Sequence, residues 1–240
     1  MMPDTKVSVV IPVGPESHHQ RWLKECLASV RAQTHSADEI LLIDDMAGLV
    51  QMETYSADDP LRECRVWCSP WRLGVGIASN FGVALAKNDL VYILNSDDWM
   101  EPECLAACVE EYERRRDPLG YYYVTVRFVS EDGYKPSYIP DSLVMDLPGG
   151  SVLVTKQLWK HTGGFPMDAG GAAEPAFISI LLGNSGAGTL YPVRQGTILH
   201  NIRVHPEQES AKRQGWLSVM SAARHLLTLE WKQPNWGRYE

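Results

Sequence analysis

The chain has 240 residues, of which 45% are hydrophobic and 22% are charged, and its formal net charge is −8 at pH 7. This composition is typical of a globular protein that buries a sizeable core, as one domain or as one domain with an appendage. The acidic balance argues against binding to bare nucleic acid or to an anionic membrane, because such binding needs clustered lysine and arginine. The short basic run of residues 114–116 is interpreted as the charged last turn of a helix.

Cysteine usage and the N-terminal sequence bear on the compartment. The five cysteines leave an odd one and lack the spacing of a zinc ribbon or finger, so we expect reduced thiols. The N-terminus lacks the basic and apolar regions of a signal peptide, and no segment approaches 18 continuous apolar residues. We therefore expect a soluble, cytoplasmic protein without a membrane span.

The first half of the chain alternates apolar runs with helical patterns. Short runs rich in apolar and β-branched residues predict strands at residues 7–12, 39–44, 65–68 and 90–94. Apolar residues at helical spacing predict helices at residues 20–33, at residues 76–87 and just after Pro102. Alternation with short connections is typical of a parallel, doubly wound sheet.

The apolar run of residues 90–94 ends abruptly in Asn95, Ser96, Asp97 and Asp98. Such a run suits a strand buried on both faces of a parallel sheet, and adjacent carboxylates cannot follow it into that core. They are expected at the carboxyl end of the strand, where open α/β sheets bind ligands and where carboxylates suit a hard divalent cation. The alternative is an acidic turn that caps the next helix.

The second half of the chain has a different pattern. Long apolar runs predict strands at residues 121–128 and 151–155, which suit a mixed or antiparallel extension of the sheet. The glycine-rich residues 163–173 predict a mobile loop over the functional site. Helices are expected at residues 175–182 and 215–229.

The order and spacing of several segments resemble those of the family two glycosyltransferases. These segments are VSVVIPV (7–13), EILLIDD (39–45), GVGIASNFGVALAKNDLVYILNSDD (74–98), GGF (163–165) and RVHPEQES (203–210). The resemblance spans about residues 6–210. It implies the α/β fold called GT-A, with a Rossmann-like, mostly parallel central sheet flanked by helices and a smaller mixed-sheet extension on the acceptor side.

The resemblance also implies a single GT-A domain over residues 1–240. Its nucleotide-sugar-binding half is expected at residues 1–100, its acceptor-side half at 101–214, and a C-terminal helix and tail at 215–240. Such enzymes typically invert the anomeric centre of a nucleotide-activated sugar with the help of Mn²⁺ or Mg²⁺.

Metal ligands are assigned by the same resemblance. Asp97 and Asp98 match the metal motif of the family, whose first position is often Asp but is Asn95 here. His205 matches a position at which some members supply a histidine to the metal or the diphosphate. The alternative for His205 is a loop histidine next to Pro206.

Donor binding is implied for residues near several strand ends. Asp45 resembles the family residue that contacts uracil, with Pro12 and Val13 beneath the base, whereas its alternative is a helix-capping acid. Arg72 or Arg203 is expected to provide a cation for the diphosphate. The full predicted donor-binding set is Pro12, Val13, Asp44, Asp45, Arg72, Gly74, Asn80, Asn95, Ser96, Asp97, Trp99 and Arg203.

Direct displacement at the anomeric carbon needs a general base that takes the proton of the acceptor hydroxyl. The resemblance makes Glu174 the candidate and Asp168 the reserve. The family has a Glu-Asp pair where this chain has Glu174 and Pro175. The alternative for Glu174 is an acid at a helix N-terminus, stabilised by the helix dipole.

The chain is therefore predicted to be an inverting, metal-dependent transferase. It would move a hexose from a nucleotide sugar, with a UDP-sugar favoured, to a hydroxyl group of an acceptor glycan, protein or small molecule. A second hypothesis is a catalytically degenerate sugar-nucleotide-binding protein, because Asn95, Ser79 and Pro175 depart from the family pattern. A third is a nucleotidyltransferase, although VIPVGPESHH lacks the glycine-rich phosphate loop of that class.

Overall fold

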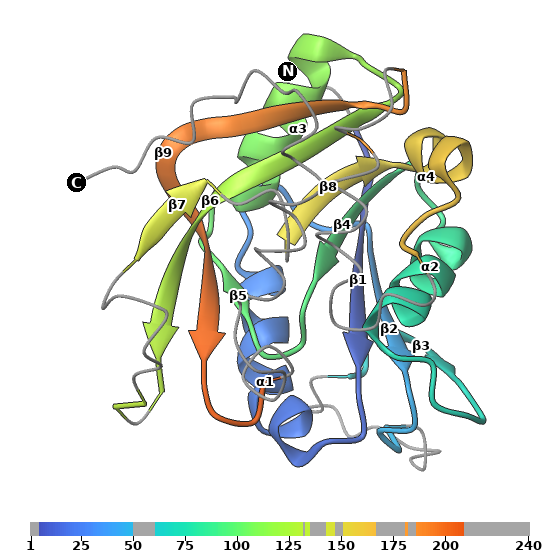
Figure 1. Cartoon of the computed structure of the whole chain (residues 1–240), viewed down its shortest axis with the longest axis vertical. Coiled ribbons are helices and arrows are strands. Elements are labelled where there is room, and N and C mark those ends of the chain that lie inside the picture. Colours follow the sequence, from blue (N-terminus) through green and yellow to red (C-terminus); the bar gives the residue numbers. More distant parts are fainter. Residues whose placement is uncertain are drawn as a thin grey trace, which may run out of the picture.

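A computed structural model describes residues 5–49, 61–131, 133–134, 143–146, 151–166, 181 and 186–208. The fold is a mixed α/β sheet with helices on both faces (Figure 1). Its strands follow the order β3-β2-β1-β4-β8-β6-β9-β5, and β7 pairs with β6. Within the described residues, no helix is long and apolar enough to cross a membrane.

The N-terminal half forms the parallel part of the sheet, as predicted. Its strands are β1 (Val7–Val13), β2 (Glu39–Asp44), β3 (Arg65–Cys68) and β4 (Leu90–Leu94). Its helices are α1 (Ser17–Arg31) and α2 (Val75–Leu85). β1 pairs in parallel with both β2 and β4, and β2 pairs in parallel with β3. The carboxyl ends of these strands therefore meet at one edge, where the polar residues after β2 and β4 converge.

The C-terminal half forms the mixed part of the sheet, which confirms the predicted extension. It contains β5 (Trp99–Met100), α3 (Cys104–Arg115), β6 (Gly120–Ser130), β7 (Val144–Asp146), β8 (Ser151–Thr155), α4 (Lys156–Thr162) and β9 (Thr189–Val204). β8 is antiparallel to both β4 and β6, whereas β9 is parallel to β6 and antiparallel to β5. The helices predicted at 175–182 and 215–229 lie outside the described residues, apart from Leu181.

β9 was not predicted as a strand, because Pro192 and Gly196 interrupt its pattern. Its pairing with β6 breaks after the partners Val124 and Val193 and resumes at Thr125 and Ile198. Residues 194–197 thus form an insertion in β9. Gly196 has a φ of 80° there, a value that glycine adopts at little cost.

The two faces of the sheet bury two apolar clusters. One cluster lies between the sheet and the helices α1 and α3 and includes Leu27 and Cys108 of those helices. The other lies between the sheet and the helices α2 and α4 and includes Val83 and Leu158 of those helices. Burying a side chain such as Leu27 contributes about 1.5–3 kcal/mol. The close packing of α2 on β1 depends on Gly82, because an added Cβ would lie 2.1 Å from a Val10 methyl carbon. This packing fixes the strand ends that carry the polar residues.

Candidate functional site

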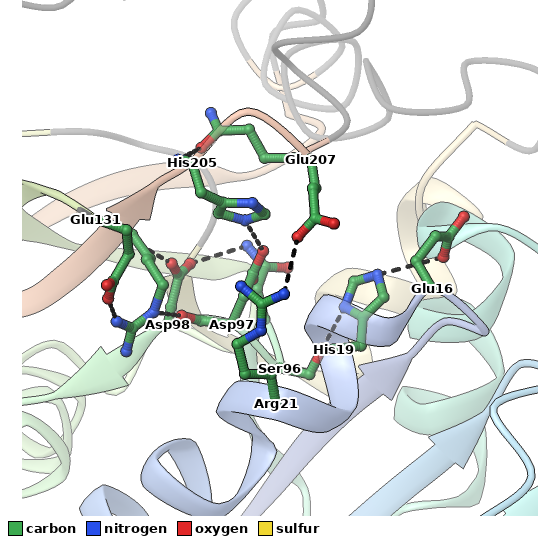
Figure 2. A network of polar contacts seen from close by, with 12 residues as sticks. Glu16, His19, Arg21, Ser96, Asp97, Asp98, Glu131, His205 and Glu207 are labelled. Carbon is green, nitrogen blue, oxygen red and sulfur yellow. Dashed lines mark hydrogen bonds and ion pairs between the residues drawn. The ribbon is translucent and has the colours of Figure 1, made fainter. Parts of the chain in front are cut away.

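The loop after β4 brings three elements together. Asn95, Ser96, Asp97 and Asp98 follow the fully buried strand β4, and the N-terminal turn of α1 and the C-terminal end of β9 lie beside them (Figure 2). The loop is closed by a hydrogen bond of 3.2 Å from the Asp98 amide to the Asn95 carbonyl. The predicted acidic pair is therefore at the carboxyl end of the strand, as expected.

Asp97 and His205 are in direct contact. The Nε2 atom of His205 lies 3.2 Å from the Oδ2 atom of Asp97. Burial raises the pKa of the Asp97 carboxyl, but the hydrogen bond from His205 and the positive charges that His19 and His205 can carry outweigh this effect, so the net pKa is lowered. Asp97 is thus a carboxylate near neutral pH. The sequence prediction that places Asp97 and His205 in one site agrees with this geometry.

Asp98 is only 3% exposed. Its Oδ1 accepts a hydrogen bond of 2.9 Å from the Arg203 amide, and its Oδ2 accepts one of 3.2 Å from the Asn95 side chain. The His200 Nε2 atom lies 3.5 Å from the same Oδ2. Burial and the neighbouring Asp97 charge raise the pKa of Asp98. These contacts tie the loop to β9.

Arg203 is a buried cation, 5% exposed, and each of its three side-chain nitrogens meets an acceptor within the protein. Its Nε donates to the Asp97 carbonyl at 2.8 Å, and one Nη atom pairs with Glu25 at 2.5 Å while the other pairs with Glu131. Its guanidinium also lies over two aromatic rings, 4.9 Å from the centroid of Trp22 and 4.6 Å from that of Trp99. These contacts hold the loop after β4 against β9, and the expectation that Arg72 or Arg203 provides a cation for the diphosphate stays a prediction.

Two histidines of the first turn of α1, which the sequence reasoning missed, lie beside the acids. The Nδ1 atom of His19 is 2.7 Å from the Ser96 hydroxyl, and His18 packs against Trp22 and His205. Burial is the main reason that the pKa of His18 is lowered to about 4, and burial also lowers the pKa of His19. Both rings are therefore neutral near pH 7. The signal in the sequence was the adjacent pair directly after the first strand and its loop.

The donor set at this end of the sheet fits a divalent cation. One ring nitrogen of His18, one of His19 and a carboxylate oxygen of Asp97 lie within 4.8 Å of one another. The Nδ1 atom of His205 is buried and has no hydrogen-bond partner among the described residues. Carboxylate oxygen and neutral imidazole nitrogen are common ligands of divalent metals.

The polar residues after β2 form the second part of the site. Asp45 is 3% exposed, and its two carboxylate oxygens accept hydrogen bonds from the amides of Leu73 at 2.5 Å and Gly74 at 2.8 Å. Gly74 has a φ of 77° and precedes α2. The amide of Asp45 in turn donates to the carbonyl of Val13 at 2.9 Å. The predicted residues Asp45, Gly74 and Val13 are thus assembled in one place.

Asp44 has a different environment. Its carboxylate accepts hydrogen bonds of 2.5–3.1 Å from the amides of three residues that follow it, Ala47, Gly48 and Leu49. It therefore shapes the turn after β2.

Arg72 links the two parts of the site. Its Nε lies 3.2 Å from Asp45, and one of its Nη atoms lies 2.8 Å from Glu16, which is itself 3.5 Å from His19. A continuous row of polar contacts thus runs from Asp45 through Arg72, Glu16 and His19 to Ser96, which precedes Asp97. Arg72 is 48% exposed in its side chain, and surface ion pairs of this kind are weak, so its guanidinium can exchange partners.

The remaining predicted residues are placed as follows. Pro12 is buried within β1, and the Trp99 side chain is partly exposed beside Arg203. The Asn80 side chain donates to the Phe165 carbonyl and accepts from the Phe165 amide, both at 2.8 Å, so it joins α2 to the GGF segment. Glu174 and Asp168 lie outside the described residues.

Comparison with known proteins agrees with this arrangement. Residues 8–163 match the family model described as Glycosyl transferase family 2. The O-antigen biosynthesis protein RfbC of Myxococcus xanthus is 28% identical over 150 residues, which are 57% of this chain and 11% of that protein. Chondroitin synthase of Escherichia coli is 28% identical over 131 residues, 53% of this chain and 18% of that protein. The chain thus spans less than a fifth of the length of these two relatives.

Solved structures with the same fold include TarS of S. aureus. TarS residues 1–349 in complex with UDP align with a TM-score of 0.61 and 16% identity, covering 94% of this chain and 67% of that one. The complex with UDP-GlcNAc gives a TM-score of 0.60 and 15% identity. These structures confirm the predicted GT-A fold. Since the family match covers more than half of its residues, this protein belongs to glycosyl transferase family 2.

Proposed function

We propose that the chain is an inverting, metal-dependent glycosyltransferase that transfers a sugar from UDP to an acceptor hydroxyl. The observation that carries the proposal is the row of polar contacts from Asp45 to Ser96, the neighbour of Asp97, across the carboxyl edge of the sheet. It offers a carboxylate for a base at one end, the exchangeable cation of Arg72 in the middle, and a donor set for a divalent cation at the other end. The fold shared with a UDP-GlcNAc complex supports the choice of UDP.

The proposed reaction assigns one role to each part of the site. Asp45 accepts hydrogen bonds from the base, and Arg72 turns from Glu16 toward the diphosphate. Asp97 and His205 would hold Mn²⁺ or Mg²⁺, with Asp98 anchoring the loop through its bonds to β9. Such a cation supplies charge neutralisation to the leaving diphosphate.

The chemical step is a direct displacement. The acceptor oxygen forms a bond to the anomeric carbon while the bond from that carbon to the diphosphate oxygen breaks, and UDP leaves. The proton of the acceptor hydroxyl passes to a carboxylate, for which we propose Glu174, with Asp168 in reserve. The site lies on a soluble domain in this proposal, with a glycan, a protein or a small molecule as the acceptor.

Calorimetric titration with UDP, with and without Mn²⁺, tests the proposal. We expect Asp97→Asn to remove most of the metal-dependent part of the affinity for UDP. We expect Asp45→Asn to weaken the affinity for UDP at least about tenfold both with and without Mn²⁺, because one charged hydrogen-bond acceptor contributes about 1.5–3 kcal/mol. Asp89→Asn is the matched control, since Asp89 is exposed at the opposite end of β4. Unchanged UDP affinity in both site variants would contradict the proposal.

A turnover assay separates catalysis from binding. With a panel of UDP-sugars and acceptors, Glu174→Gln should keep the affinity for UDP and lose sugar transfer. If the wild-type protein binds UDP-sugars but shows no turnover across the panel, it is instead a degenerate binding protein. Asn95 and Pro175, which depart from the family pattern, favour that alternative.

A further inference from the structure

We propose that His18 and His19 bind the divalent metal ion together with Asp97, so that the metal centre of this chain has imidazole ligands in addition to His205 and also binds ions such as Zn²⁺ and Co²⁺. The inference concerns the site of the proposed function, but it needs no nucleotide and no turnover. It rests on the placement of two side chains from the first turn of α1 against the loop after β4.

The three side chains are close enough to share one ion. The nearest ligand atoms of His18, His19 and Asp97 lie within 4.8 Å of one another. Ligands at about 2.1 Å from a tetrahedral ion lie about 3.4 Å apart, so side-chain movements of about 1 Å bring the three atoms to one ion. Figure 2 shows His19 beside Ser96 and His205 over Asp97, on opposite sides of the acidic loop.

The second observation is that His18 has no hydrogen bond within the described part of the chain, although it is only 3% exposed. Its ring contacts are to His19 at 4.1 Å, Trp22 at 6.1 Å and His205 at 4.9 Å between centroids. The ring nitrogens of His18 thus have no protein hydrogen-bond partner within the described residues, and a neutral imidazole nitrogen in this state can bind a metal ion. An ion shared with Asp97 would give His18 a polar partner.

Neighbouring side chains contact the proposed ligands and can orient them. The Ser96 hydroxyl at 2.7 Å from the His19 Nδ1 and the Glu16 carboxylate at 3.5 Å from its Nε2 can each orient the ring while the other nitrogen faces an ion. Contacts of this kind from a second residue to a ligating imidazole are usual at metal sites. The His205 contact to Asp97 orients the carboxylate in the same way.

The chemistry of the donors sets the preference among ions. Carboxylate and water ligands suit Mg²⁺ and Mn²⁺, whereas imidazole suits zinc, copper, iron and nickel. Nearly every nitrogen-containing site binds Zn²⁺ more tightly than Mn²⁺, so a preference for Zn²⁺ is not diagnostic by itself. The decisive quantity is the affinity that is lost when an imidazole is removed.

The test titrates the metal-free, full-length chain with Zn²⁺ and Co²⁺ in the absence of nucleotide. His18→Phe keeps an aromatic ring against Trp22 and His205 but has no ligand nitrogen, and His19→Gln keeps a hydrogen-bonding group near Ser96. We expect each substitution to weaken Zn²⁺ at least about tenfold and to change the visible absorption of bound Co²⁺. Mg²⁺ affinity should change less than threefold.

His161→Gln is the matched control, because His161 is an exposed histidine that contacts the Gly186 carbonyl far from the cluster. It should leave Zn²⁺ affinity and the Co²⁺ spectrum unchanged. If both site variants fold, as judged by circular dichroism, and bind Zn²⁺ like the wild type, the two histidines are packing residues and the inference is wrong. It is equally wrong if the wild type binds Zn²⁺ no more tightly than these variants do. The UDP titration above is read separately, so either proposal can fail alone.

Discussion

Replacing Arg203 should destabilise the protein far more than it weakens a nucleotide. The guanidinium is buried and donates to the Asp97 carbonyl, Glu25 and Glu131. We predict that Arg203→Met lowers the free energy of unfolding by about 3–5 kcal/mol, because it removes a charged hydrogen bond to a main-chain carbonyl and two cation–π contacts.

The magnitude follows from the separate contacts. A hydrogen bond from a charged donor to the Asp97 carbonyl contributes about 1.5–3 kcal/mol. Each cation–π contact, with Trp22 and with Trp99, adds about 0.5–2 kcal/mol depending on its desolvation. The pairs with Glu25 and Glu131 add less, about 0–1 kcal/mol each, because the two carboxylates are 54% and 27% exposed. Arg203→Lys keeps the charge but lacks the planar fork, so it should lose about half as much.

Urea unfolding followed by tryptophan fluorescence measures this loss, since Trp22 and Trp99 both contact Arg203. The control is Arg194→Met, which removes two exposed ion pairs with Glu103 and Glu110 and should cost less than about 1 kcal/mol. A loss below 1 kcal/mol for Arg203→Met, together with a large loss of UDP affinity, would refute the structural role. It would favour Arg203 as the cation for the diphosphate.

Two further predictions concern Asn80 and His18. Asn80→Ala removes both hydrogen bonds to the Phe165 main chain and should lower the free energy of unfolding by about 2–3 kcal/mol. The affinity for UDP should change less than threefold. A stable variant that has lost UDP binding would instead indicate that Asn80 contacts the nucleotide directly. The pKa of His18 is about 4 in the folded protein and about 6.5 in the unfolded chain. The contribution of His18 to the free energy of unfolding is therefore complete above pH 6.5 and declines as the pH falls toward 4. With allowance for solvent screening, we expect the free energy of unfolding of the wild type to fall by about 1–2 kcal/mol more than that of His18→Phe over this pH range, measured with a chelator present. Parallel curves of unfolding free energy against pH for the two proteins would contradict this prediction.

The parallel half of the fold was readable from the sequence because its signal is local. The strand β4 is an uninterrupted apolar run and β1 is one apart from Ser8, and the polar residues that follow such a run must emerge at its end. The prediction that Asp97 lies at a strand end therefore needed only the pattern of neighbouring residues.

What the sequence did not reveal depends on contacts between distant segments. Arg203 meets Glu25, which is 178 residues away, and no local pattern marks an arginine as already paired. The role of His18 likewise depends on where the first turn of α1 packs, and Ser17 begins that helix three residues before the predicted start at Gln20. β9 was missed because its pairing with β6, rather than its own composition, makes it a strand.

The insertion at residues 194–197 has a consequence for how the site tolerates change in chain length. After the insertion, β9 is aligned by two partners at once, since His200 lies opposite both Met100 of β5 and Val126 of β6. Arg194 within the insertion is held separately, by Glu103 at the N-cap of α3 and by Glu110 of α3. Residues can therefore be added between Arg194 and Ile198 without moving His200, Arg203 or His205, and the loop absorbs the extra length at a small entropic cost. A single residue added after His200 would instead turn the following side chains, including Arg203 and His205, to the opposite face of the sheet.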